Sequence, residues 1–160
     1  MSVKEQFTQA EWNSLLRAPM LAGYAVAGSD PSGKKDFIQE MSAVADAIIE
    51  GGQGTAKDSL LGSVVADIVA NAEDDQRGQT EKLSTSEVKE RALENCRAVA
   101  RLLQAKASPE EASEYKRWII SVAHRVASAA KEGGILGFGG KQVSGSEVEI
   151  INEIGEAIEV

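Results

Sequence analysis

The stretch that decides the fold class is residues 108–132, which read SPEEASEYKRWIISVAHRVASAAKE. Ser108 and Glu111 have the spacing of a capping box, in which side chains and backbone N–H groups bond reciprocally at a helix start. Pro109 stands at the first helical position, where its missing N–H group removes no intrahelical bond. The apolar residues that follow recur at steps of three and four, which predicts one amphipathic helix. They are Tyr115, Trp118, Ile119, Val122, Val126 and Ala129.

The same start signal occurs at Thr8–Glu11, Ser84–Glu87 and Ser144–Glu147. Four more segments carry an apolar face at helical spacing. These faces are Phe37, Met41, Val44 and Ile48; Leu61, Val64, Val65, Ile68 and Ala72; Val88, Ala92, Cys96, Val99 and Leu103; and Ile150, Ile151, Ile154 and Ile158. Leu60 and Val69 widen the second face, so the helix over 60–72 is expected to be central. No alternating strand pattern of useful length is present.

Turn residues predict where the helices end. Pro19 is expected to end or kink the first helix and to start a second one over 20–28, whose small residues suit close packing. Residues 29–33, 51–55 and 74–80 are predicted to be connecting loops. The prediction is therefore an all-α fold, a single-domain helical bundle of about seven helices that spans residues 1–160.

Charge and hydropathy limit the partners and the location. The net charge of −8 disfavours nucleic acid and anionic membrane surfaces, which attract clustered basic residues. The longest nearly continuous apolar run, residues 20–28, is too short to cross a bilayer. The first twelve residues lack the apolar core of a secretory signal. We expect a cytoplasmic protein that binds neither nucleic acid nor membranes.

Residues 131–143 read KEGGILGFGGKQV and concentrate five glycines. A phosphate-binding P-loop is excluded, because Ile135 occupies its first glycine position and Gln142 replaces its hydroxyl residue. The favoured interpretation is a helix cap and turn, with Phe138 packed against the Trp118 helix. The alternative is a loop that binds a partner or ligand. It would comprise Gly133, Gly134, Gly137, Phe138, Gly139, Gly140 and Lys141.

No catalytic, cofactor or metal site is predicted. His124 is the only histidine, and its helical phase places it on the polar face of its helix. Together with Cys96, the only cysteine, it supplies too few ligands for a zinc site. Cys96 lies on an apolar face and is interpreted as a small buried side chain. Asp67 is notable as an acid within a densely apolar segment.

The run EYKRWIISVAHRVASAAKEGGILGFGGKQVSGSE, residues 114–147, resembles an uncharacterised family of small all-helical bacterial proteins. Their shared motif is KEGG-x-LGFGG-x-x-VS-x-x-E, and residues 7–33 are similar to the family's opening. The chain is also similar to the tellurite-resistance TerB-like helical fold, which has acidic turns between helices. That likeness would give Asp30 and Glu147 parts in a loose cation site, although the late turn, Gly139-Gly140, lacks the aspartate.

Two functions are the main hypotheses, and an enzyme is kept as a third although no paired acid and base at a common site is evident. The first is a non-enzymatic helical protein that acts through protein–protein contacts, with a protein partner or by self-association as a homo-oligomer. The reason for this hypothesis is that the sequence lacks a catalytic set of residues and has many small residues suited to helix packing. The alternative is a metal-ion or small-molecule sensor of the TerB-like type that uses the acidic turns.

Overall fold

The protein is all-α in the computed structural model, which describes residues 3–28, 37–78, 85–132 and 145–159. For 37–41, 72–78, 85–86, 129–132 and 145–147 it describes the backbone alone. These ranges hold one short 3-10 helix, six α-helices and no strand, which confirms the predicted fold class. The elements are η1 (Val3–Gln6), α1 (Gln9–Gly28), α2 (Phe37–Gly51), α3 (Leu60–Gly78), α4 (Thr85–Lys106), α5 (Pro109–Glu132) and α6 (Gly145–Ile158).

Two of the predicted capping boxes are seen at helix starts. At α1, the Glu11 N–H donates to Thr8 Oγ1 at 3.2 Å, and the Thr8 N–H donates to Glu11 Oε2 at 2.8 Å. At α5, the Glu111 N–H donates to Ser108 Oγ at 3.2 Å, and Pro109 is the first helical residue. Ser84 and Ser144 lie outside the described residues.

Pro19 does not end the first helix, so the prediction of a separate helix over 20–28 was wrong. α1 continues through Pro19 to Gly28. The proline deprives the Leu15 carbonyl of its usual donor, because residue 19 has no N–H group. The Tyr115 hydroxyl on α5 donates to that carbonyl at 2.6 Å instead. Tertiary packing therefore supplies the bond that the helix lacks, and α1 remains one element.

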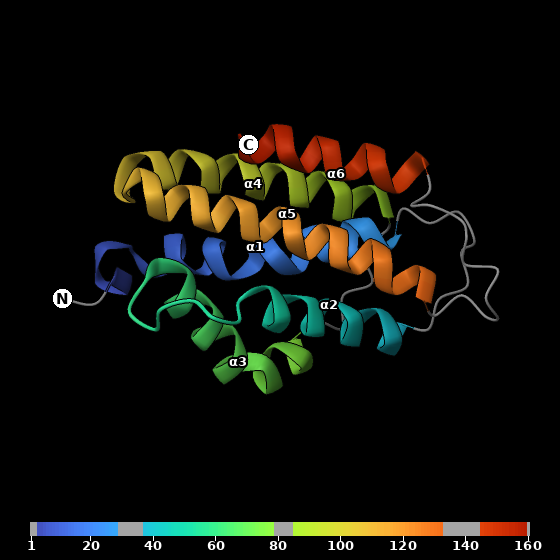
Figure 1. Ribbon diagram of the computed structural model, residues 1–160, viewed down its shortest axis with the longest axis horizontal. Coiled ribbons are helices and arrows are strands. Elements are labelled where there is room, and N and C mark those ends of the chain that lie inside the picture. The colour runs from blue at the N-terminus through green and yellow to red at the C-terminus, as the bar shows by residue number, and fades with distance from the viewer. Residues whose placement is uncertain (1–2, 29–36, 79–84, 133–144, 160) are drawn as a thin grey trace.

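The central helix is α1, and the expectation that the 60–72 helix is central was wrong. Figure 1 shows α1 in the middle of the bundle, with α4 and α6 on one side and α2 and α3 on the other. α1 buries residues around most of its circumference, including Trp12, Leu15 and Val26. α3 lies at the edge, and its Val69 side chain is 51% exposed. A broad apolar face therefore did not distinguish the central helix.

The boundaries of α3 differ in part from the predicted loops. The loop after α2 is confirmed, and within it Gly54 has φ 83°, a left-handed conformation that favours glycine. The predicted loop over 74–80 was wrong for its first part, because α3 extends to Gly78. Residues 74–77 are Asp, Asp, Gln and Arg, which are polar but compatible with a helix.

One hydrophobic core joins all six helices and is built mostly from Ala, Leu, Ile and Val. The largest buried side chains include Trp12 and Tyr115. Close approach of α1 and α2 is also confirmed, because a Cβ atom on Gly23 would lie 2.8 Å from Val44 Cγ1. None of the helices in the described ranges is long and apolar enough to cross a membrane.

Candidate interaction site

The glycine-rich segment proposed as a turn or ligand loop lies outside the described residues. This covers Gly133, Gly134, Gly137, Phe138, Gly139, Gly140 and Lys141. Asp30 also lies outside them, and of Glu147 only the backbone is described. The structure therefore tests neither the loop nor the acidic turns.

The single histidine, His124, and the single cysteine, Cys96, do not come together. The His124 side chain is exposed on α5, as the helical phase predicted. Cys96 is fully buried in the core as a free cysteine, which agrees with its interpretation as a small apolar side chain. Burial raises the pKa of the Cys96 thiol to about 12, so the reactive thiolate does not form near neutral pH.

Asp67 is held by side chains from two other elements. Its Oδ2 atom accepts hydrogen bonds from Trp12 Nε1 and from Lys4 Nζ, both at 2.8 Å. Partial burial raises the pKa of this carboxyl group, but the hydrogen bonds from Lys4 and Trp12 outweigh that effect and leave the pKa lowered. The carboxylate thus fastens η1 and α1 to α3, and we assign it a structural role.

A second ion pair joins the start of α1 to the end of α4. Lys106 Nζ lies 2.6 Å from Glu11 Oε2, the same oxygen that caps α1. The hydrogen bond from Lys106 is the main cause that lowers the pKa of Glu11. Phe7 packs beside Trp12 with ring centroids 5.8 Å apart, which is the hydrophobic staple expected at a capped start. These contacts hold the start of α1 to the end of α4, so we assign them a structural role.

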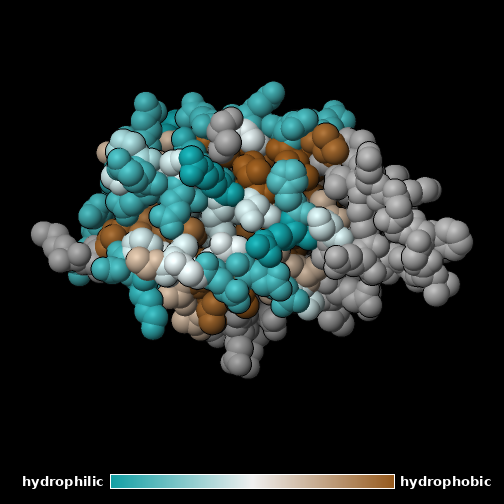
Figure 2. Space-filling model, in the orientation of Figure 1, coloured by the Kyte–Doolittle hydropathy of each residue, from teal (hydrophilic) through white to brown (hydrophobic). Residues whose placement is uncertain are grey.

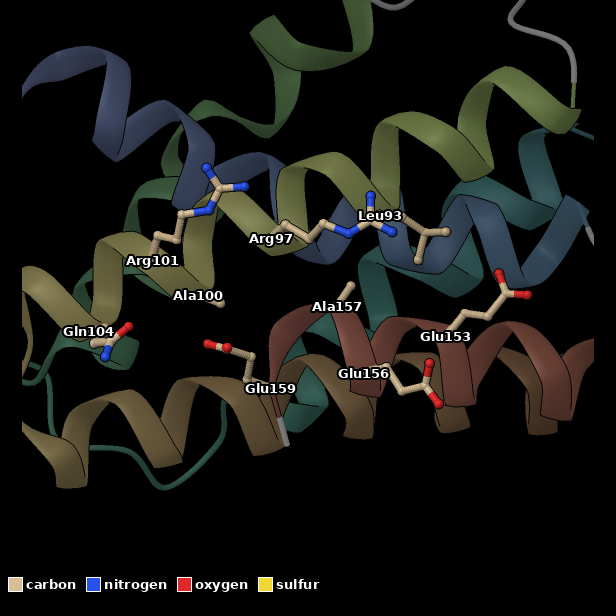
Figure 3. Close-up of a pocket in the computed structure, with 9 residues that line it drawn as sticks. All are labelled: Leu93, Arg97, Ala100, Arg101, Gln104, Glu153, Glu156, Ala157 and Glu159. Atoms are coloured by element: carbon tan, nitrogen blue, oxygen red, sulfur yellow. The ribbon is translucent and has the colours of Figure 1, made fainter.

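A groove lies between α4 and α6, and several of its charged side chains form no ion pair with the described residues. It encloses about 540 Å³, and Figure 3 shows its side chains coming from these two helices. The lining residues are Leu93, Arg97, Ala100, Arg101 and Gln104 from α4, with Glu153, Glu156, Ala157 and Glu159 from α6 and the residue after it. Ala100 and Ala157 are buried and form its floor.

The two walls of this groove carry opposite charges. Arg97 and Arg101 are exposed, and among the described residues neither forms an ion pair. On the facing wall, Glu153 pairs with Lys89 of α4 at 3.0 Å. Glu156 and Glu159 are exposed and form no such pair with the described residues. Two guanidinium groups and two carboxylates are therefore available to an incoming molecule.

This groove was not predicted from the sequence. The four-residue spacing of Arg97 and Arg101 was a visible signal that both lie on one helix face. No pattern within either segment, however, indicates that α4 and α6 are neighbours. The two helices become neighbours because both pack on α1.

The described residues contain no metal-binding cluster, because they hold no group of three or more His, Cys, Asp or Glu residues that could bind a metal ion. On the face shown in Figure 2, hydrophobic residues form small areas separated by hydrophilic ones. Comparison with known proteins finds no matching family model, no matching curated protein and no matching solved structure.

Proposed function

We propose that this chain is a non-enzymatic cytoplasmic protein that acts through contacts with another protein, and that the α4–α6 groove is its contact surface. The observation that carries the proposal is the pair Arg97 and Arg101, whose guanidinium groups are exposed without ion pairs to the described residues. Arginine is enriched at protein interfaces, where its planar fork binds carboxylate and carbonyl groups.

The composition of the groove favours a protein over a small molecule. Small-molecule pockets are lined mainly by apolar and aromatic side chains that enclose the ligand. Here the apolar lining consists of Leu93, Ala100 and Ala157, and the remaining residues are charged or polar. The alanine floor lets the side chains of a partner approach the backbone of both helices. Such a surface suits polar side chains presented by a folded partner.

Site-directed photo-crosslinking tests the proposal. A photoreactive amino acid replaces Gln104, which is exposed and lines the groove, in cells that produce the protein. The matched control replaces Gln53, an exposed glutamine in the turn after α2. We expect protein adducts from position 104 and few from position 53. Equal yields at both positions, or no protein adduct from position 104, would contradict the proposal.

A further inference from the structure

We infer that the partner in the α4–α6 groove is a second copy of this chain, related to the first by a two-fold axis. In this arrangement Arg97 and Arg101 of each copy lie against Glu156 and Glu159 of the other, respectively. The inference rests on the proposed function, because it names the partner of the same groove. Its basis is the opposite charge of the two walls and the parallel course of the two helices.

The direction of the helices permits this pairing. α4 and α6 run the same way in Figure 1, and in Figure 3 Arg101 and Glu159 lie toward one end of the groove. A two-fold axis that lies in the interface and runs along the groove places α4 of one copy over α6 of the other without reversing their direction. Arg101 then faces Glu159, and Arg97 faces Glu156. A rise of 1.5 Å per residue separates the arginines by about 6 Å and these glutamates by about 4.5 Å along their helices.

Charge complementarity favours a second copy over a peptide of one sign. An acidic segment would be attracted by Arg97 and Arg101 but repelled by Glu156 and Glu159, and a basic segment would meet the reverse. A two-fold interface brings one patch against itself, so each charge must find its opposite within that patch. The groove contains both charges on facing walls, and a second copy presents them at matching spacing.

The four side chains are available for contacts between copies. In Figure 3 the Arg97 side chain extends along α4 and the Arg101 side chain extends away from α6. Neither guanidinium group therefore points at the carboxylates of its own chain. Glu153, by contrast, is held by Lys89 at 3.0 Å, so it is left out of the pairing. Pairs formed between copies would be shielded from water more than the exposed groups are now.

Charge reversal tests the inference by light scattering and sedimentation at micromolar and higher concentrations. We expect the wild-type chain to be a dimer. The variants Arg97→Glu/Arg101→Glu and Glu156→Arg/Glu159→Arg should each be monomers, because like charges then face each other. An equimolar mixture of the two should form a dimer with one copy of each, since every reversed charge then meets its opposite. The control Arg91→Glu/Arg117→Glu changes two exposed arginines outside the groove and should remain a dimer.

A milder pair of measurements keeps the test valid if a reversed variant fails to fold. Arg97→Gln/Arg101→Gln should raise the dimer dissociation constant on the order of ten-fold. Added salt should raise the wild-type constant as well, because it screens the ion pairs. A wild-type monomer at all concentrations, or a dimer unaffected by both reversals, would overturn the inference. A crosslink from position 104 to a different protein would still support the proposed function, so the two can fail separately.

Discussion

The Tyr115 hydroxyl donates a 2.6 Å hydrogen bond to the Leu15 carbonyl at the point where Pro19 removes the normal helical donor. Both Tyr115 and Leu15 are completely buried. Burial raises the pKa of Tyr115 well above its usual range, so the hydroxyl stays protonated and remains a donor. At the preceding residue, Asn95 Nδ2 donates to the Ser14 carbonyl at 3.0 Å. Side chains of α4 and α5 thus support the central helix around its proline.

Replacing Tyr115 by phenylalanine isolates this hydrogen bond, because the ring and its packing are retained. The buried Leu15 carbonyl would then have no donor. We expect the free energy of unfolding to fall by about 1–3 kcal/mol, the usual cost of a buried unsatisfied polar group. Urea denaturation followed by circular dichroism measures this change.

Pro19→Ala provides the control for that substitution. Alanine at position 19 restores an N–H group that can donate to the Leu15 carbonyl within the helix. Tyr115→Phe should therefore cost less in the Pro19→Ala background than in the wild type, which a double-mutant cycle quantifies. Equal costs in both backgrounds would show that Tyr115 does not replace the missing donor.

Local signals predicted the helices, and long-range contacts account for the errors. The Thr8 and Ser108 caps involve partners three residues away, so the sequence shows both halves of each signal. Pro19 was misinterpreted because its compensating donor, Tyr115, stands 100 residues from Leu15 in the chain. The position of α3 at the edge was missed because a broad apolar face does not reveal which helices cover it.

The candidate site depended even more on long-range packing. The arginine spacing on α4 and the glutamate spacing on α6 could each be seen in the sequence. These arginines and glutamates face each other across the groove only because α4 and α6 pack side by side. Neither sequence segment indicates that the two helices are neighbours. The ion pair between Lys89 of α4 and Glu153 of α6 could not be predicted for the same reason.

Asp67 predicts a pH-dependent contribution to stability. Its pKa is lowered from 3.8 in the folded protein, so its stabilising effect is present above the unfolded value and is lost as pH falls through the folded value. Asp67→Asn should lower the free energy of unfolding at pH 7 by about 1–3 kcal/mol, since hydrogen bonds to a charged acceptor are lost. Chemical denaturation at a series of pH values measures the deficit.

The deficit of Asp67→Asn should shrink as the pH falls below the ordinary aspartate range, because the wild-type carboxylate then becomes protonated. Asp46→Asn is the matched control, since Asp46 is exposed on α2 and makes no hydrogen bond or ion pair with the described residues. It should change stability little at any pH. A deficit at Asp67 that stays constant from neutral to acid pH would rule out the charged contacts as its source.

Cys96 should resist thiol reagents while the protein is folded. The side chain is completely buried, and its pKa of about 12 leaves almost no thiolate at pH 8. We expect a disulfide-exchange reagent to label it only when the chain unfolds, and full labelling in concentrated urea serves as the control. Equally fast labelling in native buffer and in urea would show that the helices around Cys96 open readily.

Two helical glycines should respond in opposite directions to the same substitution. A Cβ atom at Gly62 in α3 would collide with the carbonyl oxygen of Ala56. That carbonyl cannot easily retreat, because the Ser59 N–H and hydroxyl groups both donate to it, at 3.1 and 2.6 Å. Gly62→Ala should therefore destabilise the fold by more than about 1 kcal/mol.

Gly155 in α6 is the matched counterpart. A Cβ atom there would lie 3.7 Å from Ile120 Cδ1, an ordinary van der Waals contact. Alanine also loses less conformational freedom in a helix than glycine does, so Gly155→Ala should stabilise the fold by about 0.5–1 kcal/mol. Thermal denaturation of the two variants beside the wild type decides the matter. A Gly62→Ala variant at least as stable as the wild type would mean that the contact between α3 and the Ala56 carbonyl does not limit the size of residue 62, and a destabilised Gly155→Ala would contradict the second prediction.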